Sequence, residues 1–188
     1  MSWFQVLIFM HVSMAIVWIG GGLVLQLFAY RVSLSRDPAR LAALGQDIEW
    51  IGTRLFVPAS LLSFVTGVLL VVESDFYGFG DDWIVMALVL YAVTFFAGLL
   101  FFGPESGRIG ALMAEGSPTA GARMARLVFL TRLDLVLLFL IVFVMTVKPS
   151  WSDEALVVGI VGALLAGGVV WWRYRQATAP QPAPDPGA

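Results

Sequence analysis

Five long stretches of apolar residues divide the chain, and short segments with charged side chains separate them. A helix needs about 20 apolar residues to cross a bilayer. The stretches that approach or exceed this length are residues 3–30, 55–72, 83–103, 130–147 and 155–172. They predict an all-α fold, a polytopic transmembrane bundle of five helices that forms a single domain over residues 1–175. Residues 176–188 are rich in proline and alanine, which is typical of a disordered tail.

Two of the intervening segments also have helical patterns. In "SRDPARLAALGQDIEWIGTR", Ser35 and Asp37 can cap a helix, and a proline follows at an early position. Leu41, Leu44 and Ile48 then recur three or four residues apart, as on one face of a helix. We expect this segment to extend the second span on its cytoplasmic side. The segment "GSPTAGARMARLV" predicts the same kind of extension ahead of the fourth span.

The basic residues are unevenly distributed between the two sides of the predicted bundle. Ten of the 11 are arginines in the segments after the first and third spans, early in the fourth span, and after the fifth. The loop of residues 73–82 has carboxylates and no basic residue, and Lys148 is the single cation on that side. Loops rich in arginine and lysine stay in the cytoplasm. The sequence therefore predicts a multi-pass protein of a bacterial-type inner (plasma) membrane, with its N-terminus outside and its C-terminus cytoplasmic.

Composition excludes several classes of function. Hydrophobic residues make up 60% of the chain and charged residues 13%, against about 25% charged residues in a soluble domain. The chain has no cysteine, which excludes disulfides, thiolate metal sites and iron–sulfur clusters. The arginines are dispersed rather than clustered, so no nucleic-acid partner is expected. The lipid bilayer is the one partner that the composition requires.

His11, the only histidine, lies inside the first apolar stretch. It is about eight residues from the outer end, or roughly 12 Å deep at the helical rise per residue. Bilayer lipid offers a polar group no hydrogen-bond partner. Counting from the outer ends of the spans puts Tyr91 level with His11 and Thr94 one turn deeper, so we expect these two side chains to orient the other ring nitrogen of His11 if it binds haem. His11 is therefore either a buried histidine that bonds to Tyr91 or to a backbone carbonyl, or a metal ligand that binds haem iron or copper.

Glycine and other small residues form two patterns. Gly20, Gly21 and Gly22 leave the middle of the first helix without side chains. This permits close contact with another helix, or it makes room for a flat ligand below His11. Gly159, Ala163 and Gly167 recur every four residues in the fifth span. This stripe predicts a helix contact, either within the bundle or between copies in a homo-oligomer.

A second polar group is expected near the cytoplasmic face. Arg54 opens the second span, Glu105 closes the third, and Arg132 and Asp134 lie early in the fourth. Their similar heights make arginine–carboxylate pairs plausible. We expect Asp134 to pair with Arg54 or with Arg132.

Several of these segments resemble known membrane families. "HVSMAIVWIGGG" resembles the first helix of the CopD-like copper-resistance proteins and of the HemJ-type protoporphyrinogen oxidases. "TRLFVPASLLSFVTGVLLV", "DDWIVMALVL" and "TRLDLVLLFLIVFVMTVKPS" resemble the second, third and fourth helices of the HemJ-type enzymes, over about residues 5–150 in all. The resemblance implies a haem-bearing helical bundle with His11 as an iron ligand. It suggests an uncharacterised integral-membrane branch of this superfamily.

The chain departs from the oxidase pattern in its third helix. Met86 and Ala87 stand near the position of that family's lysine, and "VTFFAG" replaces the region of its second histidine. The resemblance therefore implies binding of haem b more than it implies porphyrinogen oxidation. The other iron ligand would be water, Met86, Met145, or His11 of a second copy.

Two other functions stay open. Imidazole and thioether ligands suit Cu(I), so Met10, His11 and Met14 make copper handling an alternative, although the three side chains do not share one helix face. A structural or partner-binding membrane subunit without any ligand is the third hypothesis.

Overall fold

The computed structural model describes residues 2–35 and 37–178, and within these ranges it contains helices and no strand. The first rod consists of α1 (Trp3–Ala15), η1 (Ile16–Gly20) and α2 (Gly21–Ser35). The second consists of α3 (Pro38–Ile51), η2 (Gly52–Phe56) and α4 (Val57–Val72), and the third of α5 (Asp82–Ala97), η3 (Gly98–Phe102) and α6 (Gly103–Ala114). The last two rods are α7 (Ala120–Val147) and α8 (Glu154–Thr178). The segments η1, η2 and η3 are single wide π-helical turns.

Five rods are long and apolar enough to cross a membrane: Trp3–Val32, Ala43–Val72, Asp82–Ala114, Ala120–Val147 and Glu154–Gln176. The predicted polytopic bundle of five helices is thus confirmed. Both predicted extensions are also helical, since α3 leads without a break into α4, and α7 begins at Ala120. The third span continues beyond residue 103 to Ala114.

Two of the three π-helical turns, η2 and η3, lie shortly before a proline. A proline inside a helix lacks an N–H group, and its ring clashes with the carbonyl four residues earlier. Here η2 ends two residues before Pro58, and η3 ends two residues before Pro104. A π turn widens the helix at such a point. The chain therefore passes both prolines without ending the rod.

The first three residues of the predicted tail are helical. Gln176–Thr178 belong to α8 rather than to a disordered segment, because the first proline of this region is Pro180 and nothing before it stops the helix. Residues 179–188 lie outside the described part of the chain.

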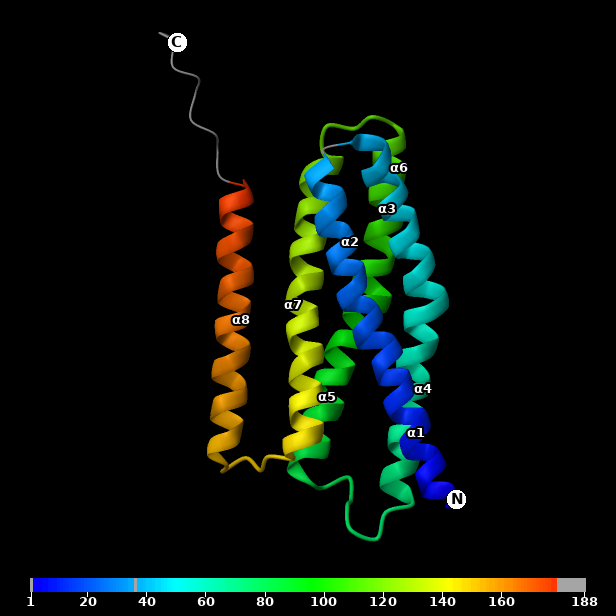
Figure 1. Cartoon of the computed structure of the whole chain (residues 1–188), viewed down its shortest axis with the longest axis vertical. Helices are drawn as coiled ribbons and strands as arrows, with labels where there is room; N and C mark the ends of the chain where they lie inside the picture. The colour runs from blue at the N-terminus through cyan, green and yellow to red at the C-terminus, as the bar shows by residue number, and fades with distance from the viewer. Residues whose placement is uncertain (1, 36, 179–188) are drawn as a thin grey trace.

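The rods pack as antiparallel neighbours (Figure 1). Within the bundle α1 packs on α4, α5 packs on α7, and α3 packs on α6. The N-terminus, the α4–α5 loop and the α7–α8 loop lie together at one end, hereafter the N-terminal end. The opposite end carries the arginines of α2, α3, α6, early α7 and late α8, and is called the arginine-rich end.

The last rod, α8, packs chiefly on α7 and stands at the edge of the bundle (Figure 1). A Cβ atom on Gly159 would lie 2.5 Å from the ring of Phe143, and one on Gly167 would lie 3.7 Å from Leu133, both on α7. The small-residue stripe that includes Ala163 therefore makes a helix contact within the chain. The homo-oligomer through the same stripe stays a prediction.

Candidate functional site

The site begins with a stripe of small side chains on α4. Ala59, Ser60, Ser63 and Thr66 recur three or four residues apart and are buried. The hydroxyl groups bond within their own helix: Ser60 donates to the Val57 carbonyl at 3.0 Å and Thr66 to the Leu62 carbonyl at 2.7 Å. These local bonds satisfy the Ser60 and Thr66 hydroxyls without partners from other helices. Such a face lets α1 approach α4 closely.

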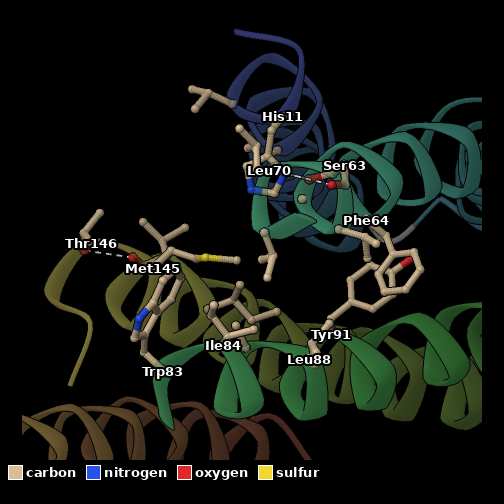
Figure 2. Close-up of a pocket in the computed structure, with 18 of the residues that line it drawn as sticks. His11, Ser63, Phe64, Leu70, Trp83, Ile84, Leu88, Tyr91, Met145 and Thr146 are labelled. Carbon is tan, nitrogen blue, oxygen red and sulfur yellow. Dashed lines mark hydrogen bonds between the residues drawn. The ribbon is translucent and has the colours of Figure 1, made fainter. Parts of the chain in front are cut away.

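His11 projects from α1 onto this stripe (Figure 2). Its Nδ1 atom lies 2.7 Å from the backbone carbonyl oxygen of Ser63 and 3.5 Å from the Ser63 hydroxyl. A carbonyl oxygen can only accept a hydrogen bond, so Nδ1 carries the proton. In the neutral ring Nε2 then has a free lone pair. No hydrogen bond to Nε2 exists among the described residues, so the lone pair of Nε2 is available to accept a hydrogen bond or to coordinate a metal ion.

Gly67 makes the room for the imidazole. A Cβ atom at this position would lie 3.0 Å from Cε1 of His11 and 3.2 Å from Nδ1. Carbon atoms in contact prefer about 3.5–4.0 Å. Any larger residue at position 67 would therefore push the ring away from the Ser63 carbonyl.

A cavity of about 740 Å³ lies beside His11, between α1, α4, α5 and α7. Ligand pockets typically measure ~300–1,000 Å³. Figure 2 shows His11 on one wall, with Ile84 and Leu88 of α5 across from it and the sulfur of Met145 on α7 directed into the space. The walls are mainly aliphatic and aromatic side chains. The histidine is thus a polar atom at the edge of an apolar chamber.

Tyr91 and Thr94 do not orient His11 as expected. The Tyr91 hydroxyl donates to the Ser60 carbonyl at 3.4 Å, and the Thr94 hydroxyl donates to the Tyr91 carbonyl at 3.1 Å. Tyr91 instead lines the cavity and stacks on Phe64, with the ring centroids 4.9 Å apart. Because α1 packs on α4, the nearest acceptor for His11 is a carbonyl of α4. The backbone-carbonyl alternative is therefore the one observed.

The three consecutive glycines differ in their surroundings. Gly20 lines the cavity, and a Cβ atom there would meet nothing within 4 Å. A Cβ atom on Gly21 would lie 2.7 Å from Phe56, and one on Gly22 would lie 4.0 Å from Leu135. Gly21 thus serves close helix packing, Gly22 faces α7 at ordinary contact distance, and Gly20 alone adds space to the cavity.

The methionines separate into two groups. Met145 lines the cavity, whereas Met86 is 6% exposed and belongs to a core cluster with Ala87 and Val144. Met10 and Met14 are not among the lining residues. The described part of the chain also has no group of three or more histidine, cysteine or carboxylate residues that could hold a metal ion. Met145 is therefore the methionine that lines the cavity together with His11.

The expected polar group does not assemble. Glu105 bonds to Arg123 at 2.9 Å and to Arg108 at 3.4 Å, which joins α6 to α7. Arg54 lies over the ring of Trp50. In residues 2–35 and 37–178 Asp134 forms no ion pair within 4.0 Å, so the predicted pairing of Asp134 with Arg54 or Arg132 is wrong. Similar height along the membrane normal does not bring side chains to the same side of a helix.

A different polar contact crosses the bundle near Asp134. The side-chain amide of Gln26 on α2 donates to the Thr131 hydroxyl on α7 at 2.6 Å. The Gln26 Oε1 atom is buried and has no hydrogen-bond partner among the residues that the structure describes. This contact ties the first and fourth spans together between the cavity and the arginine-rich end.

Two site residues, Ser63 and Gly67, had no role in the reasoning from His11. Their signal was present as small residues at positions 59, 60, 63, 66 and 67 of an otherwise bulky span. That spacing marks one helix face for close contact. It does not say which helix makes the contact.

In the comparison with protein families, the family described as "Predicted integral membrane protein (DUF2269)" matches residues 5–149. The matched region runs from within α1 to just beyond the end of α7 and contains every residue of the cavity wall except Phe4. No curated protein matches the chain, and no solved structure does. The relationship to the CopD-like and HemJ-type families is not part of this match and stays a prediction.

Proposed function

Since the chain belongs to the DUF2269 family of predicted integral membrane proteins, we propose that it is a membrane haem protein in which Nε2 of His11 ligates the iron of haem b. One observation carries the proposal. Nε2 accepts no hydrogen bond from any described residue, and the ring lines an apolar cavity of about 740 Å³, while Nδ1 donates to the Ser63 carbonyl at 2.7 Å.

The donor set fits a haem ligand. Histidines that bind metals usually donate their other ring N–H to a carbonyl or carboxylate, which fixes the tautomer and raises the basicity of the ligating nitrogen. The Ser63 carbonyl has this role for His11. Met145 supplies a thioether on the cavity wall, and histidine with methionine is a known axial pair. When bound, the haem would supply one-electron redox chemistry.

The residues of the chain would bind and shield the group. Apolar side chains of four helices exclude water, Gly20 adds space, and the aromatic pair of Tyr91 and Phe64 forms a flat wall. The resemblance of residues 11–22 to helices of the HemJ-type enzymes supports the same ligand. The missing third-helix lysine favours a binding or electron-transfer role over porphyrinogen oxidation.

The proposed orientation places the N-terminal end, and with it the cavity, on the outer side of a bacterial-type inner membrane. The asymmetry of the arginines supports it. In this orientation the cavity lies in the outer half of the bilayer.

The test is the visible spectrum of protein purified from haem-replete cells. Wild type should show a Soret band, and His11→Ala should lose it. Phe9→Ala is the matched control, because Phe9 lies on the same helix with 71% of its side chain exposed and does not line the cavity. A colourless wild type after haem supplementation, or His11→Ala with full haem, would overturn the proposal. Metal analysis of a colourless protein would then separate copper binding from a ligand-free subunit.

A further inference from the structure

Lys148, the single lysine of the chain, closes the N-terminal end of the cavity. It is the C-cap of α7, with a φ angle of 52° in the left-handed region, and its N–H donates to the Val144 carbonyl at 2.9 Å. A non-glycine residue adopts this conformation at some cost in free energy. The position therefore uses a lysine where glycine would be the easier choice for a helix end.

Two aromatic rings hold the ammonium group of Lys148. Its Nζ atom donates to the Tyr77 hydroxyl at 2.8 Å. It lies 4.1 Å from the ring centroid of Tyr77 and 5.0 Å from that of Trp83. Both residues line the same cavity. An ammonium group has three N–H donors, so two stay available after the bond to Tyr77.

Asp81 and Asp82 line a second, smaller pocket together with Lys148, but no ion pair within 4.0 Å joins Lys148 to a carboxylate of the described residues. Asp81 accepts from the backbone N–H of Gly78 at 3.1 Å, Asp82 from that of Trp151 at 3.0 Å, and Asp153 from that of Ser150 at 2.7 Å. Lys148 takes part in no ion pair in the described part of the chain. The N-terminal end thus holds a cation that lines an apolar cavity and has no ion pair within 4.0 Å among the described residues.

We propose that Lys148 and Tyr77 bind the carboxylate of an amphiphile whose apolar body occupies the cavity. A charge-assisted hydrogen bond from Nζ would hold the head at the membrane surface, and the four helices would bury the remainder. Haem has such carboxylates in its propionate groups, and a fatty acid has one as well. The inference rests on the same cavity as the proposed function, but it does not require iron ligation by His11.

The test compares acids with their esters in detergent-solubilised full-length protein. The probes are haem and haem dimethyl ester, and a fluorescent long-chain fatty acid and its methyl ester. Lys148→Asn removes the charge and keeps a residue that tolerates the left-handed conformation, and Lys148→Arg keeps the charge. Arg175→Asn, a lost cation at the arginine-rich end, is the matched control. Melting curves establish that each variant folds.

At least one acid should bind wild type, Lys148→Arg and Arg175→Asn about tenfold more tightly than Lys148→Asn. Its ester should bind all four proteins equally. Lys148-dependent binding of the fatty acid without any haem binding would support this inference and refute the haem proposal. If haem binding depends on His11 and both acids bind Lys148→Asn as tightly as wild type, this inference alone is refuted. It is also overturned if no acid binds wild type, or if acid and ester lose affinity alike.

Discussion

Gly67→Ala should detach His11 from the Ser63 carbonyl while leaving the fold intact. The added Cβ would lie 3.0 Å from Cε1 of the ring, so the ring must move by about 0.5 Å to reach ordinary contact. That shift stretches the 2.7 Å hydrogen bond to about 3.2 Å, the limit of a normal one. Weakening this bond costs at most about 1 kcal/mol, and the better helix propensity of alanine returns about the same amount. Stability should therefore hardly change.

The matched control is Gly162→Ala on α8. A Cβ atom there meets nothing within 4 Å, so the variant should gain the propensity of about 1 kcal/mol without a steric cost. The two substitutions are chemically identical. They differ in whether a histidine lies in the path of the new methyl group.

The chain has one histidine, so selective ¹⁵N-histidine labelling gives one pair of ring signals. In the protein without haem, wild type and Gly162→Ala should show a neutral ring with the proton on Nδ1. Gly67→Ala should show a mixture of tautomers, and its affinity for haem should fall about 10- to 100-fold, as for other lost partners of metal-bound histidines. The reasoning is refuted if Gly67→Ala keeps the Nδ1–H signal of wild type, or if wild type has its proton on Nε2.

Four further outcomes are expected. Asp134→Asn should leave the melting temperature unchanged or raise it, because the carboxylate has no ion pair to lose, whereas Glu105→Gln should lower it by removing the contacts to Arg123 and Arg108; the opposite order would mean that Asp134 is paired. Met145→Leu should change the spectrum of bound haem, and Met86→Leu should not; equal spectra would exclude Met145 as a ligand. A reporter fused after Arg175 should be active only in its cytosolic form, and periplasmic activity would invert the orientation. Gly159→Val should weaken the α7–α8 contact, because its Cβ would meet Phe143 at 2.5 Å, and protease cleavage of the α7–α8 loop should become faster in detergent; an unchanged rate would count against that contact.

The spans could be predicted from the sequence because the membrane imposes a length on apolar stretches. The first rod, Trp3–Val32, agrees with the pattern to within two residues, and the second and fourth rods end at the predicted residues Val72 and Val147. The wide turns could not be predicted in the same way. Pro58 and Pro104 suggest a distortion, but whether the helix ends, kinks or widens depends on the packing around it.

The sequence predicted how deep each site residue lies along its helix, but not which neighbouring helix its side chain faces. Counting along helices correctly gave His11 as the polar group of the N-terminal half and correctly left a backbone carbonyl as one possible partner. It also selected Tyr91, which lies on the wrong helix to bond with His11. The same limit explains Asp134, whose expected partners share its depth but not its side of the bundle. Depth follows from one helix at a time, whereas direction requires knowing which helices are neighbours.

The bond from His11 to a main-chain oxygen has an evolutionary consequence. Position 63 can change its side chain without losing the acceptor, since every amino acid supplies the same carbonyl. Selection to keep the histidine oriented would therefore act on size at position 67 rather than on chemistry at position 63. In an alignment of relatives, position 63 would therefore be variable, and the covariation between positions 11 and 63 would be weak. Position 63, whose carbonyl holds the imidazole, would be evident from the structure but would leave little trace in a sequence alignment.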